Sequence, residues 1–242
     1  MGTYCFGIDV GGTTVKCGLF RTDGTLVEKW EIPTRKENNG DQILPDVAAA
    51  VNAKMEEKGI SKEEVEGVGI GVPGPVDSLG IVHRCVNLGW GVVNVAEELE
   101  SLTGLKVKVG NDANVAALGE MWQGGAKGCK DVIMVTLGTG VGGGIIVDGK
   151  IVAGFNGAGG EIGHITVNND EIEACNCGQY GCLEQYTSAT GIVRLAKRKL
   201  AKSTDETSIR AIENLTAKDV FDAAKAGDQI AIGLVDEVCE IL

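Results

Sequence analysis

Two glycine-rich segments, one near the start of each half of the chain, most constrain the fold of this 242-residue protein. The first runs from Asp9 to Lys16 (DVGGTTVK), the second from Thr136 to Gly144 (TLGTGVGGG), and each lies between two β-rich runs. Glycine permits positive φ angles that turn several backbone N–H groups toward one point, and threonine hydroxyls add donors. The repeated order of strand, glycine turn and strand predicts two lobes that close on one polyphosphate.

Each segment taken alone is also compatible with an ordinary hairpin turn, because glycine is common in turns. Neither is a Walker A motif, and neither opens a helix as a dinucleotide-binding fingerprint does. The residues predicted to contact phosphate are Gly11, Gly12, Thr13, Thr14, Lys16, Gly138, Thr139 and Gly140.

The remaining pattern predicts an α/β fold with a first lobe over residues 1–120 and a second over 121–242. We expect strands over 4–10, 13–20, 25–32, 65–72, 105–110 and 131–137, and helices over 41–58, 94–103, 113–123, 183–201, 216–226 and from 228 onward.

Local sequence patterns predict the caps or the exposed face of three of these helices. Asp41 is the expected N-cap of the helix over 41–58, whose core face carries apolar residues at helical spacing, namely Val47, Val51 and Met55. Thr216 and Asp219 predict a capping box. The Lys197-Arg198-Lys199 run is expected on the solvated face of the helix over 183–201.

A second motif brings together four metal ligands, His164, Cys175, Cys177 and Cys182. Three thiolates and one imidazole complete a tetrahedral shell, which is typical of structural zinc. Such a metal would fix the segment between two carboxylates, Glu161 and Glu184. The alternative is a set of reduced, unpaired cysteines near a histidine.

Net charge, cysteine spacing and apolar run length indicate which partners and which compartment to expect. A net charge of −12 argues against a nucleic-acid backbone as partner. The other cysteines follow no regular spacing, which fits a reducing cytoplasm. No apolar run reaches the length of a membrane span, and a signal peptide is not expected, because a strand is predicted from residue 4.

Seven motifs, in their order and spacing, make the chain similar to the ROK family (repressor, open reading frame, kinase) and to its bacterial glucokinases in particular. They are Asp9 to Lys16, Gly71-Val-Pro-Gly74-Pro75, Asn87-Leu-Gly-Trp90, Asn111-Asp112-Ala-Asn114, Leu137-Gly-Thr-Gly140, Gly160-Glu161-Ile-Gly-His164 and Cys175 to Glu184.

The resemblance implies a two-lobed actin-like ATPase (ribonuclease H-like) fold and a cytoplasmic homodimer that phosphorylates a hexose, expected to be glucose, with ATP and Mg²⁺. It places Asp9 near Mg²⁺ and assigns sugar hydroxyls to Asn111, Glu161, His164 and Glu184, with the loops of Gly74 and Asn87 facing the same cleft. Typical members are longer, so the second lobe is expected to be incomplete and to lack adenosine contacts. The helix-turn-helix of the family's repressors is not expected, since the first strand begins at residue 4.

Asp112 is the expected general base that accepts the proton of the sugar 6-hydroxyl. It stands between a strand and a helix, whose N-terminus would lower its pKa; alternatively, it is only the helix N-cap. Similarly, Asp9 could simply cap its glycine turn. His164 could bind zinc with one ring nitrogen and a sugar oxygen with the other, or serve the metal alone.

Three rival hypotheses remain open. The acceptor could be fructose, mannose, allose or an N-acetylhexosamine. The protein could be a sugar-sensing regulator of the same fold, although a sensor has no need of Asp112. It could also be a zinc-stapled scaffold, which would leave both phosphate loops unexplained.

Overall fold

The computed structural model describes residues 2–242, and the chain divides into two compact units. Unit 1 comprises Met1–Ile133 and Gly144–Gly160, and unit 2 comprises Met134–Gly143 and Glu161–Leu242. The predicted lobe boundary after residue 120 stays a prediction.

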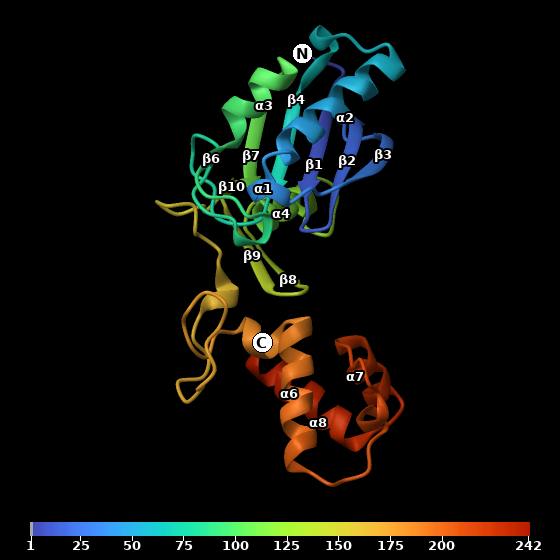
Figure 1. The fold of residues 1–242 in the computed structure, drawn as a ribbon, viewed down its shortest axis with the longest axis vertical. Helices are drawn as coiled ribbons and strands as arrows, with labels where there is room; N and C mark the ends of the chain where they lie inside the picture. The colour runs from blue at the N-terminus through green and yellow to red at the C-terminus, as the bar shows by residue number, and fades with distance from the viewer. Residues whose placement is uncertain (1) are drawn as a thin grey trace. The chain divides into compact units, whose positions relative to one another are not determined.

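Most predicted elements are present, several with bounds shifted by one or two residues (Figure 1). The strands are β1 Tyr4–Val10, β2 Thr14–Arg21, β3 Leu26–Pro33, β4 Val65–Val72, β5 Ile81–Val82, β6 Val93–Asn94, β7 Val107–Asn111, β8 Val132–Leu137, β9 Val141–Val147 and β10 Lys150–Ile151. The α-helices are α1 Glu37–Gly40, α2 Ile43–Lys58, α3 Val95–Thr103, α4 Asp112–Gln123, α5 Glu184–Thr187, α6 Ala189–Lys202, α7 Ala217–Lys225 and α8 Gln229–Ile241. None of the helices among residues 2–242 combines the length and apolar character that crossing a membrane requires.

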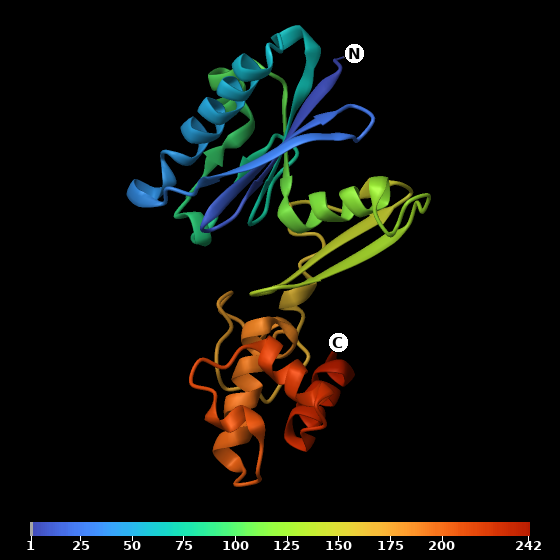
Figure 2. The ribbon, with the colours of Figure 1, turned by 90° about the vertical axis from the view of Figure 1, so that its right-hand side faces the viewer.

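A five-stranded sheet in the order β3-β2-β1-β4-β7 forms the centre of unit 1. Strand β1 runs antiparallel to β2 and parallel to β4, and β4 runs parallel to β7. Because side chains alternate along a strand, one face collects buried aliphatic and aromatic residues, such as Phe6, Ile8 and Val10 of β1. Helices α2 and α3 cover this face (Figure 2). Val47, Val51 and Met55 of α2 are buried in this core, as predicted.

The opposite face of the sheet is glycine-rich, and helix α4 packs there. Gly71 of β4 and Gly110 of β7 alternate with the core residues, and a Cβ at either position would crowd the side chain of Val115 in α4. The same alternation puts Asp9 of β1 on this face, opposite to Ile8 and Val10. The glycines therefore let the start of α4 approach the end of β1.

A three-stranded sheet, β10-β9-β8, follows α4. A turn at Asp148-Gly149 joins β9 to β10, and both residues have positive φ angles. The tip of the β8–β9 hairpin, Met134–Gly143, belongs to unit 2.

Unit 2 has its own apolar core, formed by α5, α6, α7 and α8. The single helix predicted over 183–201 is wrong, because Ser188 has an extended backbone and separates α5 from α6. Ser188 instead caps α6 by accepting a hydrogen bond from the N–H of Gly191. The capping box of Thr216 and Asp219 at α7 is confirmed.

The predicted cap of α2 is also wrong. Helix α2 begins at Ile43, after Gln42, and its start has no side-chain cap. Asp41 instead follows the short helix α1, in which Asn38 and Asn39 have positive φ angles. The sequence did not predict α1 as a separate element, although its asparagine and glycine residues bend the chain here.

Candidate functional site

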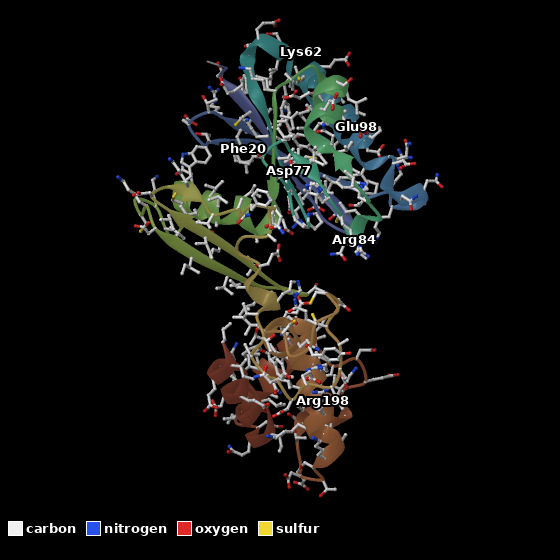
Figure 3. The ribbon with its side chains drawn as sticks, turned by 90° about the vertical axis from the view of Figure 1, so that its left-hand side faces the viewer. Phe20, Lys62, Asp77, Arg84, Glu98 and Arg198 are labelled. Atoms are coloured by element: carbon white, nitrogen blue, oxygen red, sulfur yellow. The ribbon has the colours of Figure 1, made fainter. Side chains whose placement is uncertain are left out.

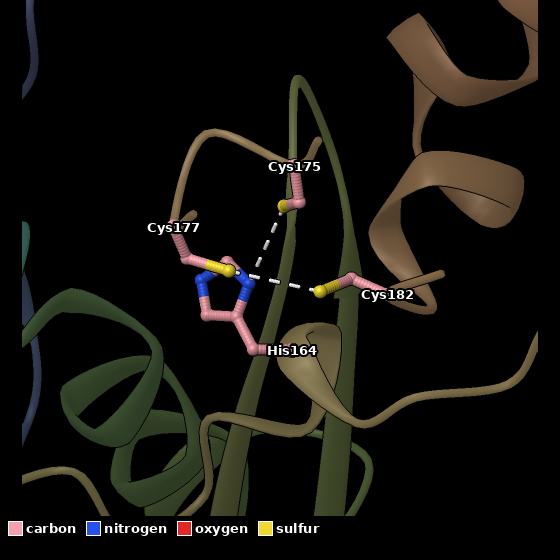
Figure 4. Close-up of side chains that lie close together, drawn as sticks. All are labelled: His164, Cys175, Cys177 and Cys182. Atoms are coloured by element: carbon pink, nitrogen blue, oxygen red, sulfur yellow. Dashed lines mark hydrogen bonds between the residues drawn. The ribbon is translucent and has the colours of Figure 1, made fainter. Parts of the chain in front are cut away.

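The four predicted metal ligands lie together in unit 2 (Figure 4). The ligand atoms of His164, Cys175, Cys177 and Cys182 all lie within 4.8 Å of one another. The Sγ atoms of Cys177 and Cys182 are 3.6 Å apart, and Cys175 Sγ is 3.8 Å from His164 Nδ1. Zinc bonds of about 2.3 Å to sulfur and about 2.0 Å to nitrogen put neighbouring ligands of a tetrahedron about 3.5–3.8 Å apart. The donor set and its spacing thus fit a zinc ion.

Burial raises the pKa of the Cys175 thiol to about 12 and also raises the pKa of Cys182. A metal favours the thiolate, so binding would release protons from these residues. The protonated Cys175 thiol lies 3.3 Å from Oε1 of Glu184 and donates to it. Thiolate formation would remove this donor, which links the metal ligands to a predicted sugar ligand.

A buried ion cluster anchors the segment that leads to Cys175, and sequence reasoning did not find it. The Glu171 carboxylate is buried and receives hydrogen bonds from the guanidinium groups of Arg194 and Arg198 and from the Tyr186 hydroxyl. The hydrogen bond from Arg198 is the main reason why the pKa of Glu171 lies well below its ordinary value. Arg198, labelled in Figure 3, therefore belongs to an ion cluster, whereas Lys197 and Lys199 of the same run are exposed as predicted.

The predicted sugar ligands of unit 2 flank the tip of the β8–β9 hairpin. Glu184 begins α5, and its Oε2 lies 3.3 Å from the N–H of Val141, from which it accepts a hydrogen bond. Gly163, between Glu161 and His164, packs so closely on Val141 that a Cβ would overlap the Val141 carbonyl group. The motif containing Glu161 and His164 and the motif containing Glu184 thus both contact one residue next to the second glycine loop.

Asp112 is the first residue of α4, but it does not cap the helix. The N-cap is Asn111, whose Oδ1 accepts a hydrogen bond from the N–H of Asn114 at 3.1 Å. Asp112 instead accepts from the N–H of Ala113 at 2.8 Å. The alternative that Asp112 is only a cap is therefore wrong.

The pKa of Asp112 is raised, contrary to the prediction. Desolvation by the surrounding protein is the largest cause, although the side chain is exposed to solvent, and the charge of Asp9 adds to it. The hydrogen bond from Ala113 at the helix N-terminus only partly opposes these effects. A carboxylate with a raised pKa is a stronger proton acceptor, which suits a general base.

Asn111 also joins the loop of Gly74 to the start of α4. Its Nδ2 donates to the Gly74 carbonyl at 3.2 Å. Gly74 has a φ of 97°, and a Cβ there would lie 2.8 Å from the carbonyl oxygen of Arg84, so glycine is required. Asn87 is exposed on a single 3-10 turn, Val86–Leu88. These three predicted sugar residues, with Asp112, belong to unit 1.

The first glycine loop joins β1 to β2. The N–H of Gly11 donates to the Thr14 carbonyl at 3.0 Å, and Lys16 of β2 pairs in register with Asp9 of β1. Their charged groups are 3.9 Å apart and both side chains are largely exposed. Asp9, Lys16 and the loop therefore lie at the edge of the sheet where α4 begins.

The second glycine loop joins β8 to β9, where the N–H of Gly138 donates to the Gly140 carbonyl at 3.0 Å. Among the described residues, no predicted phosphate-binding glycine (Gly11, Gly12, Gly138 or Gly140) has a positive φ, so the expected origin of the outward N–H groups is wrong. The lack of a side chain leaves space at these positions instead. A Cβ on Gly12 or Gly138 would meet no atom within 4 Å, so the backbone there is open. A Cβ on Gly140 would overlap the Glu184 carboxylate.

The chain is similar to known proteins over almost its whole length. The ROK family profile matches residues 5–242. A glucokinase of Halalkalibacterium halodurans is 45% identical over 98% of this chain and 73% of its own length. A ROK glucokinase of Streptomyces griseus, solved with glucose and AMPPNP, superposes with a TM-score of 0.77 at 34% identity, over 98% of this chain and 76% of that one.

Relatives with other names also match. An N-acetyl-D-glucosamine kinase of Aliivibrio fischeri is 33% identical over 98% of this chain and 76% of its own length. A xylose repressor of Caldicellulosiruptor bescii is a more distant match. The chain belongs to the ROK family. Its α/β fold is the actin-like ATPase fold of the family's sugar kinases.

Proposed function

We propose that this protein is a glucokinase that transfers the γ-phosphoryl group of ATP to the 6-hydroxyl of glucose. The observation that carries the proposal is Asp112. Its carboxylate is not used to cap α4, has a raised pKa, and lies near enough to Asp9 for the charge of that residue to contribute to the shift. The similarity to glucokinases of two organisms supports glucose as the acceptor.

Asp112 acts as the general base in this proposal. Its ionised carboxylate accepts the proton of the sugar 6-hydroxyl while that oxygen attacks the γ-phosphorus, and the bond from phosphorus to the leaving ADP oxygen breaks. Phosphoryl transfer depends mainly on positioning and on charge stabilisation. The base therefore needs a fixed place, which the capping of α4 by Asn111 supplies.

The sugar is bound, we propose, by Asn111, Asp112, Glu161, His164 and Glu184, with the loops of Gly74 and Asn87. A carboxylate can accept from two hydroxyls, which suits a polyol. His164 directs Nδ1 toward Cys175, so its Nε2 remains to contact a sugar oxygen. A structural zinc on the four ligands would hold both motifs and would free Glu184 from the Cys175 thiol.

ATP phosphates are assigned to the two glycine loops, with Lys16 as the nearby cation and Asp9 toward Mg²⁺. When bound, Mg²⁺ would neutralise charge that develops on the transferred phosphoryl group. Support comes from the pairing of Asp9 and Lys16 beside Gly11 and Gly12, and from the space beside Gly12 and Gly138, which leaves the backbone open to a ligand.

A homodimer in the cytoplasm is the proposed state of the protein, by analogy with the family. Light scattering coupled to size-exclusion chromatography would test the dimer. A single mass near that of the 25.1 kDa chain would exclude it.

A kinase for another sugar is the second candidate, because an N-acetyl-D-glucosamine kinase is also a relative. A regulator that binds sugar without turnover is the third, because a repressor matches as well. The presence of Asp112 favours an enzyme over a regulator, since a sensor needs no base.

An ADP-release assay across a panel of hexoses tests these candidates together. The panel contains glucose, mannose, fructose, allose and N-acetylglucosamine, each with ATP and Mg²⁺. We expect the highest kcat/KM for glucose, and Asp112→Asn as the matched inactive control. A higher kcat/KM for another sugar would replace glucose as the substrate. Sugar binding without ADP release would favour the regulator.

A further inference from the structure

Each predicted phosphate loop is held from its carbonyl side by a threonine that lies outside the glycine motif. In the first loop, the Thr34 hydroxyl donates to the Gly11 carbonyl at 2.7 Å, and the Thr34 N–H donates to the Thr13 carbonyl at 2.9 Å. Thr34 directly follows β3, whose last residue, Pro33, pairs with Thr14. The third strand of the sheet thus delivers Thr34 to the loop.

The second loop is held in the same way by the start of α6. The Thr190 hydroxyl donates to the Thr139 carbonyl at 2.8 Å, and the N–H of Ala189 donates to the Gly138 carbonyl at 2.8 Å. The first N–H groups of a helix have no partner within the helix, so α6 can use one for the loop. Ser188, the N-cap of α6, has its hydroxyl 3.0 Å from that of Thr190.

These contacts determine where the loop N–H groups point. In a planar trans peptide, the carbonyl of one residue and the N–H of the next point in opposite directions. A carbonyl held by Thr34 or by the start of α6 therefore turns the following N–H away. Outside the strands, the N–H groups so directed are those of Gly12, Thr139 and Gly140, and within residues 2–242 none of these three donates to a protein acceptor.

We propose that Thr34 and Thr190 are positioning residues that aim the backbone donors of the two loops at the phosphates of ATP. This inference rests on the proposed kinase function and deepens it, since neither threonine lies in a glycine motif. Donors that are already oriented lose less entropy when they bind a ligand, and they need no reorganisation as charge develops. The hydrogen bonds of Thr34 and Thr190 thus take the role in orienting the loop N–H groups that the sequence had suggested for glycines with positive φ angles.

The alternative is that the two threonines only stabilise the fold. That role would change the melting temperature and would affect both substrates alike. Positioning predicts a selective effect on ATP, because the hydroxyls contact the phosphate loops and not the residues assigned to the sugar.

The test compares Thr190→Val and Thr34→Val with Thr190→Ser and Thr34→Ser. Valine keeps the shape but removes the donor, whereas serine keeps it. We expect each valine variant to raise the KM for ATP about two- to ten-fold, as loss of one hydrogen bond implies, with the KM for glucose nearly unchanged. The serine variants should restore most of the ATP affinity.

Thr187→Val is the matched control. The Thr187 hydroxyl donates to the Leu183 carbonyl within unit 2 at 3.1 Å and is not bonded to the loop. This variant should leave the KM for ATP at the wild-type value. Titration of a non-hydrolysable ATP analogue into each folded variant measures the same selectivity without turnover.

An unchanged KM for ATP in both valine variants, in protein whose wild type is active, would overturn the inference. An equal rise in both KM values, or an equal effect in Thr187→Val, would do the same. Wild-type protein that releases no ADP with any hexose would instead refute the proposed function itself, so the two failures are distinguishable.

Discussion

At the residue scale, Asp112 combines two properties that favour a chemical role. Its neighbour Asn111 makes the capping hydrogen bond, so Asp112 is not needed to start α4. Desolvation by the surrounding protein and the charge of Asp9 raise its pKa, so the native protein holds a carboxylate in an environment that disfavours its charge. Groups kept at some cost in stability are typical of functional sites.

Asp112→Asn should leave glucose binding nearly intact and lower kcat by about 10²-fold or more, because the amide keeps the size but cannot accept the proton. Steady-state kinetics and calorimetric titration with glucose would measure the two effects. A kcat near that of the wild type would remove Asp112 from the mechanism.

The same variant should be more stable than the wild type at pH 7. A carboxyl group whose folded pKa lies above its ordinary value of 3.8 contributes stability that is fully present below that value and is lost as pH rises through the folded pKa. The gain from Asp112→Asn should therefore shrink as pH falls toward about 4. Urea unfolding at a series of pH values measures it. A wild type that is the more stable protein at pH 7 would contradict the direction of the pKa shift.

Gly138→Val should impair ATP binding, whereas Gly163→Ala should lower stability. A Cβ on Gly138 would meet no atom within 4 Å, so that variant should fold normally while its bulk obstructs phosphate and raises the KM for ATP more than that for glucose. A Cβ on Gly163 overlaps the Val141 carbonyl, so that variant should lose stability by about 1–3 kcal/mol. Thermal unfolding and kinetics of both proteins separate the outcomes. Destabilised Gly138→Val would show that the space beside Gly138 is not open.

At the element scale, the segment from Glu161 to Glu184 is tied down at several points. Four potential metal ligands of the segment lie together, and Glu171 joins it to α6 through Arg194 and Arg198. Gly163 and Glu184 fix its ends against Val141. The segment has little regular secondary structure, so these contacts determine its shape.

Cys177→Ser should abolish stoichiometric zinc binding and weaken glucose binding, although Cys177 is not assigned to the sugar. Elemental analysis should find about one zinc per wild-type chain. Cys129→Ser, which changes an exposed cysteine outside the cluster, is the control and should keep both zinc and glucose affinity. A zinc-free Cys177→Ser protein with unchanged glucose affinity would separate the metal from the substrate.

Sequence predicted the elements better than the contacts between them. Alternation and helical spacing are local, so β1, β2, β4, α2 and α7 were found with small errors in their bounds. Motif spacing brought the cysteines and His164 together correctly. The break at Ser188 was missed, because a serine inside a helical pattern gives no sign that its hydroxyl caps a new helix.

Contacts distant in the sequence were the second class of omission. Thr34 lies 23 residues from Gly11, and Thr190 lies 51 residues from Thr139. Glu171 lies 27 residues from Arg198. No periodicity or spacing rule relates such pairs, so only the folded chain reveals that these residues are hydrogen-bonded to one another.

At the scale of the whole molecule, two separate apolar cores stabilise the chain. One core uses residues from Phe6 to Val107 in unit 1, and the other uses residues from Tyr186 to Val238 in unit 2. The residues assigned to the sugar are divided between the units, with Asp112 in unit 1 and Glu161, His164 and Glu184 in unit 2. The four potential metal ligands all belong to unit 2. Loss of the metal should therefore act on one core and spare the other.

Removal of zinc by a chelator should speed amide hydrogen exchange in residues 161–202 and leave exchange in the five-stranded sheet nearly unchanged. The reason is that all four ligands, and the ion cluster of Glu171 that anchors them to α6, belong to unit 2. Exchange measured by mass spectrometry with and without chelator gives the comparison, and Cys177→Ser without chelator should reproduce the chelated pattern. Equal loss of protection in β1 and β4 would mean that the units unfold as one, and the independence inferred from their separate cores would then be wrong.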